Sequence, residues 1–516
     1  MHQLRPVLKK IFFSKFISSS STMVSKLSLT INDIPQPKKL PLIGTKLDFI
    51  AAGSGSKLHE YIDRRHKQLG DVFREKLGGS ADLVFVSDPM LIRTIFLNLE
   101  GKYPAHILPE PWILYEKLYG SKRGLFFMNG EEWLENRRIM NKYLLKEGSE
   151  NWLEAPVKAT VDNFIHKWRE QAKKGNFIPD LEKEFYRLSI DVIIAMMLGN
   201  KSSLKPDKYC DTLLDKFSEA VKKIFQTTTK LYGLPIHLCQ KLNLKVWKDF
   251  KECVDISLQL AHKIVSEILN NKLNSNGLIK MLSDDNVKDE VIKKIMGDFV
   301  IAAGDTTSYT SLWTLHLLSN HDTVKEEICS ENHSLILYVI KESMRLYPVA
   351  PFLTRILPQN CQLGPYQLNE GRNIYIRKSC PFGGWVGFHF SKIKKKISER
   401  SYLLQTPVIA SIYTSGRDEK NFSRADEFLP YRWNRNDLRK KDLVNHVSLA
   451  SLPFALGARS CIGRKLAMLQ MTELITQIVE NFEIKSMNTN MVNANTSQVL
   501  VPNTDIKLMF SLKKQN

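Results

Sequence analysis

The sequence has 516 residues, of which 43% are hydrophobic, so one large globular unit can bury an ample core. Its formal net charge of +20 favours an acidic partner, nucleic acid or an anionic membrane surface. The seven cysteines, an odd number without metal-ligand spacing, argue against a disulfide framework, and no stretch approaches the roughly 18 apolar residues of a membrane span.

The first residues indicate a targeting sequence. The stretch "MHQLRPVLKKIFFSKFISSSSTMVSK" contains no acidic residue, alternates basic with apolar residues at near-helical spacing, and is rich in serine. This pattern is typical of a mitochondrial transit peptide, and a disordered basic tail is the alternative. We therefore expect residues 1–30 to be a transit peptide and the folded body to begin near residue 35, at the Pro-rich "IPQPKKLPLIGT".

Helical periodicity dominates the rest of the chain, and strand-like alternation is rare. The sequence predicts helices over residues 57–67, 89–97, 130–145, 152–173, 183–197, 210–229, 244–271, 288–320 and 335–346. It predicts strands over residues 71–77, 81–87, 406–414 and 504–512. No Pro/Gly/Ser linker divides the middle, so we expect a mainly α fold with small β-sheets in a single domain.

Three of the later segments carry polar residues in apolar surroundings. "VIAAGDTTSYTSLW" places Asp305 and Thr306 beside Gly304 in an apolar helix, where they could interrupt the helical hydrogen bonds and make a pocket for water or oxygen. The alternative is that the hydroxyl groups bond to carbonyls of their own helix. "KESMRLYP" and "FLPYRW", taken alone, predict no more than a surface ion pair and an aromatic turn.

The most specific segment is "PFALGARSCIG", residues 453–463, in which glycines frame Cys461. Small residues let the backbone approach a flat group closely. The helix that follows supplies N–H donors and a positive dipole, which stabilise a thiolate. Such a thiolate suits an axial ligand of haem iron, whereas a lone cysteine in a turn is more often an inert apolar residue.

Together and in this order, these segments resemble the cytochrome P450 family, over the chain from residue 35 to its end. The family pattern F-x-x-G-x-R-x-C-x-G is matched by Phe454, Gly457, Arg459, Cys461 and Gly463. The resemblance implies the cytochrome P450 fold, a single haem-containing domain, and a monooxygenase with haem b as its cofactor. Cys461 is then the proximal ligand of the iron.

The resemblance also implies roles for residues in the weaker segments. Asp305 and Thr306 match the catalytic acid–alcohol pair that delivers protons to iron-bound oxygen. Ala303 stands where many relatives have glycine, so a kink in this helix would depend on Gly304. A second group matches the buried ion network that braces the haem-binding core: Glu342, Arg345 and Arg432.

The haem propionates are anionic and need partly buried cations. Four residues match the family positions for this contact: Trp133 and Arg137 in "EEWLENRR", Arg355 in "PFLTRIL", and Arg459. Without the family context, Trp133 and Arg137 would simply lie on an amphipathic surface helix.

The N-terminal presequence and three basic residues indicate the branch of the family. Microsomal members begin with an apolar anchor helix, whereas this chain begins with a basic presequence. Lys341, Arg464 and Lys465 match the proximal-face cations of mitochondrial members. The implied partner is an acidic, adrenodoxin-like ferredoxin with its NADPH-dependent reductase. The implied location is the matrix side of the inner mitochondrial membrane, with peripheral membrane association.

Within that branch, "RGLFFMNGEEWLENRR" and "ESMRLYPVAPFLTR" look most similar to the insect mitochondrial ecdysteroid 2-hydroxylases of the shadow type. This similarity implies a steroid substrate and hydroxylation at carbon 2 in ecdysone biosynthesis. A mitochondrial P450 acting on another sterol or on xenobiotics is the alternative, and a silent haem or sterol binder is a further one. Nucleic acid is not an expected partner, because the positive charge is spread without a recognised binding module.

One segment does not fit the family. Residues 372–405 carry many basic residues and an aromatic run with neither helical nor strand periodicity. Without them, "CQLGPYQLNEG" would join "TPVIASIYTSGRD" and is expected to form a hairpin with it. We interpret residues 372–405 as a non-native insertion, from a retained intron or a gene-model error; a lineage-specific loop is the alternative.

Overall fold

The computed structural model describes most of the chain in ten ranges: residues 29–38, 44–77, 82–120, 124–199, 208–232, 234–270, 276–329, 334–357, 360–368 and 406–513. Nearly all of the expected transit peptide and all of the proposed insertion at residues 372–405 therefore lie outside the described residues. Both interpretations stay predictions of the sequence.

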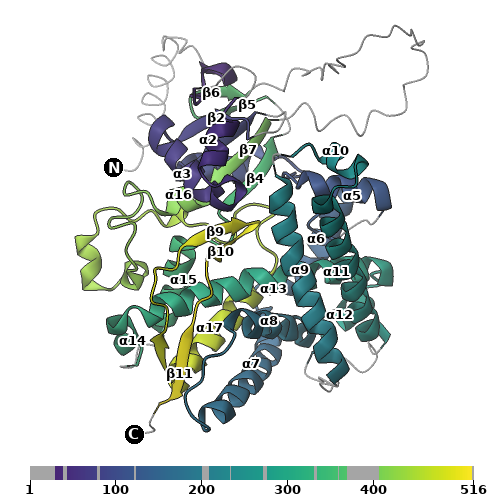
Figure 1. The fold of residues 1–516 in the computed structure, drawn as a ribbon, viewed down its shortest axis with the longest axis vertical. Coiled ribbons are helices and arrows are strands. Elements are labelled where there is room, and N and C mark those ends of the chain that lie inside the picture. Colours follow the sequence, from purple (N-terminus) through teal and green to yellow (C-terminus); the bar gives the residue numbers. More distant parts are fainter. Residues whose placement is uncertain are drawn as a thin grey trace, which may run out of the picture.

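A long central helix, α13 (Asp289–Ser319), organises the helical part of the molecule (Figure 1). It packs against α8 (Leu181–Leu198), α11 (Lys245–Asn270) and α15 (Ser334–Leu346). Most of its residues are buried, as expected for a helix that is apolar on most of its surface. The polar segment around Asp305 thus lies in the interior of the domain.

The remaining helices surround this core. They are α2 (Lys46–Ala51), α3 (Leu58–Leu69), α4 (Pro89–Thr94), α5 (Glu110–Tyr119), α6 (Gly130–Leu144), α7 (Glu150–Ala172), α9 (Lys208–Leu231), α10 (Ile236–Lys241), α12 (Leu278–Asp284), α14 (Asp322–Cys329), α16 (Ile412–Gly416) and α17 (Arg464–Asn481). The nine predicted helices all exist, with boundaries shifted by a few residues. Six short helices were missed, α2, α5, α10, α12, α14 and α16, because five to ten residues carry too little periodicity. Helix α16 begins inside the predicted strand 406–414, which ends at Ser411.

The strands form small sheets. The largest contains β2 (Val72–Glu75), β3 (Leu83–Val86), β7 (Thr406–Ser411) and β4 (Phe352–Leu357) in that order, with only β3 and β7 parallel. The others join β1 (Leu29–Thr30), β6 (Tyr366–Leu368) and β5 (Cys361–Leu363); β9 (Ala494–Ser497) and β10 (Val499–Pro502); and β8 (Phe482–Ser486) and β11 (Leu508–Leu512). The expected class, mainly α with small β-sheets, is confirmed.

The expected hairpin across the proposed insertion is wrong. Strand β6 pairs with β5 through a tight turn at Gly364, whereas β7 pairs with β3 and β4 in a different sheet. The two segments on either side of residues 372–405 therefore do not pair with each other. A positive φ at Gly364 allows the turn between β5 and β6 to be only two residues long, so the hairpin closes before the insertion begins.

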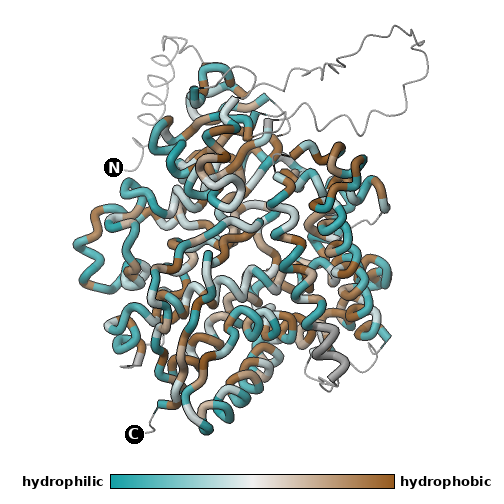
Figure 2. The backbone as a smooth tube through the Cα atoms, in the orientation of Figure 1, coloured by the Kyte–Doolittle hydropathy of each residue, from teal (hydrophilic) through white to brown (hydrophobic). Residues whose placement is uncertain are grey.

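The hydropathy pattern agrees with a globular helical body. Figure 2 shows hydrophobic and hydrophilic residues alternating along the peripheral helices, as expected where one face packs on a core. Over the ranges that the structure describes, no helix is long and apolar enough to cross a membrane.

Candidate functional site

The loop before α17 folds tightly around Cys461. The backbone N–H of Cys461 donates to the carbonyl of Phe454 at 2.8 Å, and that of Ser460 donates to the carbonyl of Gly457 at 3.1 Å. Helix α17 begins at Arg464, three residues after the cysteine. The sequence prediction that this cysteine precedes a helix is confirmed, and the loop presents its side chain at the helix start.

A glycine is required at position 457 by packing as well as by conformation. Gly457 has a φ of +76°, and a Cβ there would lie 2.2 Å from the carbonyl oxygen of Phe96 and 2.5 Å from Oε1 of Glu100. Glu100 is buried, and it accepts hydrogen bonds from Arg355 Nε at 2.7 Å and from the N–H of Ala458 at 2.9 Å. Glu100 thus ties the cysteine loop to β4. Sequence reasoning missed it, because a single acid in "LNLEGKYP" carries no local signal.

The thiol of Cys461 combines two properties that rarely occur together. Its side chain has accessible surface, yet burial raises the pKa of the thiol, against the lowering effects of the Gly463 N–H, Arg137 and Arg464. The surrounding protein atoms therefore desolvate the thiol without covering it completely. A bound metal cation would stabilise its thiolate form, so the chemistry of this position fits a haem-iron ligand.

Helix α6 and the cysteine loop bring three of the predicted propionate-binding residues together. Arg137 Nη2 donates to the carbonyl of Ser460 at 2.7 Å, and the guanidinium of Arg459 lies 4.3 Å from the ring centroid of Trp133. Arg459 also donates to the carbonyl of Met128 at 2.6 Å. Burial lowers the pKa of Arg137 to about 10. These side chains form a basic cluster beside Cys461.

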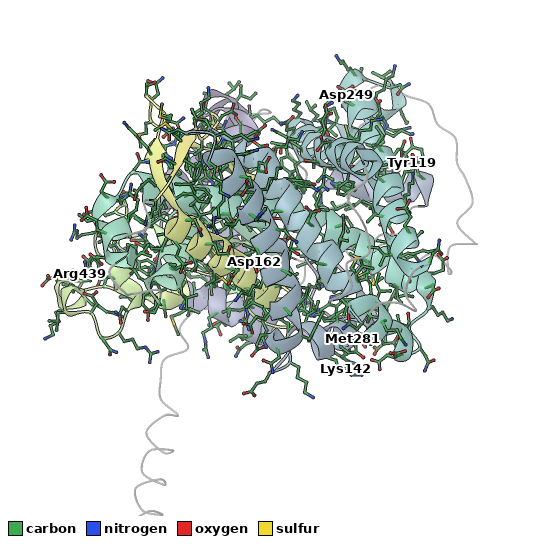
Figure 3. The ribbon with its side chains drawn as sticks, turned by 90° about the horizontal axis from the view of Figure 1, so that it is seen from below. Tyr119, Lys142, Asp162, Asp249, Met281 and Arg439 are labelled. Atoms are coloured by element: carbon green, nitrogen blue, oxygen red, sulfur yellow. The ribbon has the colours of Figure 1, made fainter. Side chains whose placement is uncertain are left out.

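The C-terminal end of α6 contacts α12 and Asp285, the residue that follows it. Lys142 Nζ lies 2.8 Å from Asp285, and Tyr143 donates to the carbonyl of Met281 in α12. Figure 3 shows Lys142 and Met281 next to each other at the lower edge of the molecule. The helix that carries Trp133 and Arg137 is therefore fixed against the helical body.

The fourth predicted residue, Arg355, is buried on β4 and forms an ion pair with Glu100. Burial lowers its pKa. Three buried nitrogens of this region have no acceptor among the described residues: Arg137 Nε, Arg355 Nη2 and His106 Nε2. Each unsatisfied donor costs about 1–3 kcal/mol, so the region is short of acceptors. The carboxylates of a haem supply acceptors of the required charge, and the residues present therefore fit this group.

Of the two alternatives for the polar segment of the central helix, the bonding of its hydroxyl groups to carbonyls of their own helix is confirmed, and the interruption is wrong. Helix α13 is continuous, and the Thr306 hydroxyl donates to the carbonyl of Ala302 at 3.0 Å. Gly304 has a packing role instead, because a Cβ there would lie 2.6 Å from the ring of Tyr186 in α8. Ala302 is exposed and Thr306 partly exposed within this mostly buried helix. This face of α13 therefore borders open space.

Asp305 and Thr306 lie next to each other in the chain but in different surroundings. Asp305 is buried, and burial raises its pKa to about 7, with a further contribution from Glu182 and an opposing one from Lys222. Asp305 in turn contributes to raising the pKa of the buried Tyr186. Glu182 pairs with Lys222 of α9 and accepts a hydrogen bond from Tyr309 at 2.9 Å. The structure thus surrounds the acid with a polar cluster that the sequence did not predict.

The predicted ion network is assembled around one carboxylate. Glu342 Oε1 accepts from Arg345 Nη2 at 2.7 Å and from Arg432 Nε at 2.8 Å, and Trp433 Nε1 donates to Oε2 at 2.8 Å. All three charged side chains are fully buried. Helix α15 positions two of them, and η6 (Pro430–Trp433) supplies Arg432.

The three predicted redox-partner residues differ in availability. Arg464 is exposed, and no ion pair of its side chain occurs among the residues that the structure describes. Lys465 Nζ is held 2.5 Å from Glu150 and 2.7 Å from the carbonyl of Lys146. Lys341 lies 5.7 Å from the ring of Tyr338. Only part of the predicted basic surface is therefore free to meet a partner.

The comparison with protein families decides the identity. The family model described as "Cytochrome P450" matches residues 34–379 and 392–510. The chain belongs to the cytochrome P450 family. As a P450 the protein is a monooxygenase, and the resemblance stated from its motifs is confirmed. Residues 380–391, which the P450 model leaves unmatched, lie within the proposed insertion.

Individual relatives of this P450 carry mitochondrial names. It is 36% identical to cytochrome P450 315a1, mitochondrial, of Drosophila melanogaster, over 92% of this chain and 88% of that protein. It is 26% identical to the mitochondrial 1,25-dihydroxyvitamin D(3) 24-hydroxylase of Rattus norvegicus, over 93% of this chain and 89% of that one. It is also 26% identical to the mitochondrial cholesterol side-chain cleavage enzyme of Ovis aries, over 88% of this chain and 84% of that protein. The similarity to the mitochondrial class is thus confirmed.

Proposed function

We propose that this P450 is a mitochondrial steroid hydroxylase that uses haem b, held by the thiolate of Cys461. The observation that carries the proposal is the loop in which Cys461 is desolvated but accessible. It lies beside a basic cluster whose donors are not all satisfied by the described residues. Trp133, Arg137, Arg355 and Arg459 hold the haem carboxylates, and Glu342, Arg345 and Arg432 brace the core beneath them.

Bound haem supplies the activation of molecular oxygen, which thiolate coordination favours. The protein side chains supply protons and exclude water. Thr306 lies on the open face of α13 and holds a proton on its hydroxyl, while Asp305 lies on the buried face, where the charges of Glu182 and Lys222 act on its carboxyl. A carboxyl with a pKa of about 7 both accepts and releases protons near neutral pH, as a general acid–base group requires.

The proposed reaction is hydroxylation of a 2-deoxyecdysteroid at carbon 2, in the biosynthesis of ecdysone. The support is the motif similarity to insect ecdysteroid 2-hydroxylases together with the likeness to a mitochondrial P450 of an insect. Hydroxylation of another sterol is the second candidate, because relatives at 26% identity are named for vitamin D and cholesterol substrates. Conversion of xenobiotics is a third.

We propose a matrix-side location on the inner mitochondrial membrane, with a ferredoxin and its NADPH-dependent reductase as electron donors. The mitochondrial names of the relatives and the acid-free N-terminus support this location. Exposed apolar side chains support peripheral membrane contact: Leu47 and Ile50 on α2, and Leu238 and Leu242 at α10.

The decisive experiment is the carbon monoxide difference spectrum of the reduced protein, which reports thiolate-ligated haem. We expect Cys461→Ser to abolish the thiolate signal. Cys361→Ser is the matched control, because Cys361 is also partly accessible but lies on β5. A Cys461→Ser protein with an unchanged spectrum would contradict the proposal.

The substrate is tested on the native chain with ferredoxin, its reductase and NADPH. A 2-deoxyecdysteroid should yield a product hydroxylated at carbon 2, whereas cholesterol and a vitamin D steroid should yield little. Preferential turnover of either of the latter would move the assignment to the second candidate.

A further inference from the structure

A cleft of about 690 Å³ lies apart from the residues assigned above to the haem. It is lined from α3, the C-terminal end of α13, the helices α14, α15 and α16, η6 and the segment before β9. Figure 1 shows α14 and α16 on the left of the molecule and α6, which carries Trp133 and Arg137, on the right. Small-molecule sites have volumes of about 300–1,000 Å³, so the cleft is large enough for a second ligand.

One side of the cleft is aromatic and held by its neighbours. The ring of Tyr347 stacks on that of Trp313, with centroids 3.9 Å apart and planes at 3°. The guanidinium of Arg417 lies 5.4 Å from the ring centroid of Tyr347 and 4.9 Å from that of Tyr413. Arg417 Nη2 in turn donates to the carbonyl of Leu346 at 2.9 Å. Because these contacts fix the rings in advance, a ligand would lose little free energy in ordering them.

The charged groups of the cleft already have partners. The arginine, aspartate and glutamate side chains of the described lining all take part in ion pairs: Arg417 with Asp426, Arg439 with Glu327, Arg424 with Glu427 and Lys57 with Glu60. Burial lowers the pKa of His59 to about 4, so this ring is neutral as well. An ionic ligand would have to compete with these existing pairs. The lining therefore favours a neutral ligand.

Uncharged polar groups of the lining are available for hydrogen bonds. The hydroxyl groups of Tyr347 and Tyr413 make none with other residues that the structure describes, and both side chains are partly exposed. Burial raises the pKa of Tyr413 to about 12, so its hydroxyl keeps its proton and can donate. His321 Nδ1 donates to the carbonyl of Leu317 at 2.7 Å, which leaves Nε2 of the neutral ring as an acceptor. These groups suit a ligand that carries several hydroxyl groups.

We propose that this cleft is a second binding site, which takes a neutral steroid with several hydroxyl groups. The inference rests on the proposed function, because a 2-deoxyecdysteroid and its 2-hydroxylated product are the steroids that such an enzyme encounters. The flat ring system packs on apolar side chains of the lining, among them Val324, Leu335 and Phe428. The steroid hydroxyl groups bond to the hydroxyls of Tyr347 and Tyr413.

The test measures steroid binding while the site at the iron is occupied. Full-length protein loaded with haem is saturated with a bulky azole that coordinates the iron. Equilibrium dialysis then measures the binding of labelled 2-deoxyecdysteroid, of its 2-hydroxylated product and of cholesterol. We expect saturable binding of an ecdysteroid, and cholesterol, with its single hydroxyl group, should bind about tenfold more weakly.

Binding of either ecdysteroid beside the azole supports the proposal, and the two dissociation constants show which of them the cleft prefers. Absence of saturable binding of both ecdysteroids overturns it. Cholesterol binding as tight as that of the ecdysteroids also overturns it, because the cleft would then recognise only apolar surface.

A bulky substitution tests whether the bound steroid lies in the cleft. Thr323 is an exposed residue of α14 that lines the cleft, so Thr323→Trp fills space there without entering the core. Glu326→Trp is the control, because it adds the same ring at an exposed position of α14 outside the lining. We expect Thr323→Trp to weaken ecdysteroid binding at least about tenfold and Glu326→Trp to stay within about twofold of the native protein. Native affinity in Thr323→Trp contradicts the proposal.

A second pair of variants tests the hydroxyl groups. The double variant Tyr347→Phe, Tyr413→Phe keeps both rings and should bind about tenfold more weakly, because two hydrogen bonds are lost. Tyr366→Phe, on β6 and outside the lining, should bind as the native protein does. Native affinity in the double variant would show that these hydroxyl groups do not recognise the steroid.

Spectra recorded without the azole distinguish failure of this inference from failure of the proposed function. The change in haem absorption on addition of 2-deoxyecdysteroid reports binding at the iron. That change without any binding beside the azole refutes only the second site. Steroid binding in the cleft by a protein that does not hydroxylate steroids refutes only the proposed reaction.

Discussion

Two buried clusters of arginine differ in how their N–H donors are satisfied. In the network around Glu342, Arg345 uses all five N–H donors, on that carboxylate and on the carbonyls of Gly416, Ala425 and Glu427. In the cluster near Cys461, one donor of Arg137 and one of Arg355 have no acceptor within the part of the chain that the structure describes. Both clusters are shielded from solvent, yet only one is complete within the protein.

The difference distinguishes a structural site from a binding site. A buried ion network that satisfies its own donors has nothing left to offer a ligand, and its value lies in holding η6 against α15. A buried cluster with spare donors costs stability until an anionic ligand arrives. Arginine therefore has a structural role where the protein provides acceptors for all its N–H donors, and a ligand-binding role where it does not.

The largest expected effect comes from breaking the complete network. Glu342→Gln removes the charge that Arg345 and Arg432 share, and an uncompensated buried cation costs about 3–5 kcal/mol. Denaturant unfolding of the full-length protein measures the loss. Glu427→Gln is the control, because the Glu427 carboxylate pairs with Arg424 at the surface. This substitution should lower the free energy of unfolding by less than about 1 kcal/mol. Equal small losses in both variants would show that the Glu342 network is not structural.

An intermediate effect is expected in the cluster near Cys461, and it concerns the rate of haem release rather than the free energy of unfolding. Arg137→Met removes the hydrogen bond to the Ser460 carbonyl but also a buried Nε–H without an acceptor among the described residues. The two effects offset each other, so the unfolding free energy of protein stripped of haem should change by less than about 1 kcal/mol. Haem release should accelerate about tenfold, because a charged partner of a carboxylate is lost. Arg138→Met, on the adjacent exposed position of α6, should change neither quantity. Strong destabilisation without faster haem release would place Arg137 with the structural arginines.

The smallest effect is expected at the surface, where Lys465 is paired with Glu150 and no ion pair of Arg464 occurs among the described residues. Arg464→Glu should slow ferredoxin-driven turnover several-fold at low salt, because exposed charges steer association and are screened over about 10 Å at 0.1 M salt. Lys465→Gln should have a weaker effect, since the ammonium group of Lys465 is already paired with the carboxylate of Glu150. The measurement is the turnover rate against ferredoxin concentration at several ionic strengths. A larger loss in Lys465→Gln would mean that its ion pair opens to receive the partner.

The sequence by itself determined those features that are local in the chain. The pattern around Cys461 sufficed to predict the cysteine loop and the helix behind it, because glycine conformations and helix starts depend on near neighbours. Long periodic segments predicted the main helices for the same reason. The Glu342 network could be proposed only by family resemblance, since its members lie up to 90 residues apart.

The tertiary structure alone decided which donors have partners. Glu100 and His106 entered the site because strand register and the cysteine loop place them beside Arg355 and Arg459, and no spacing in the sequence records that contact. Likewise, the close contact of Gly304 with Tyr186 could not be read from the sequence, which also left the continuity of α13 open. Burial and hydrogen-bond satisfaction are properties of contacts between distant segments, so they become known only when the chain is folded.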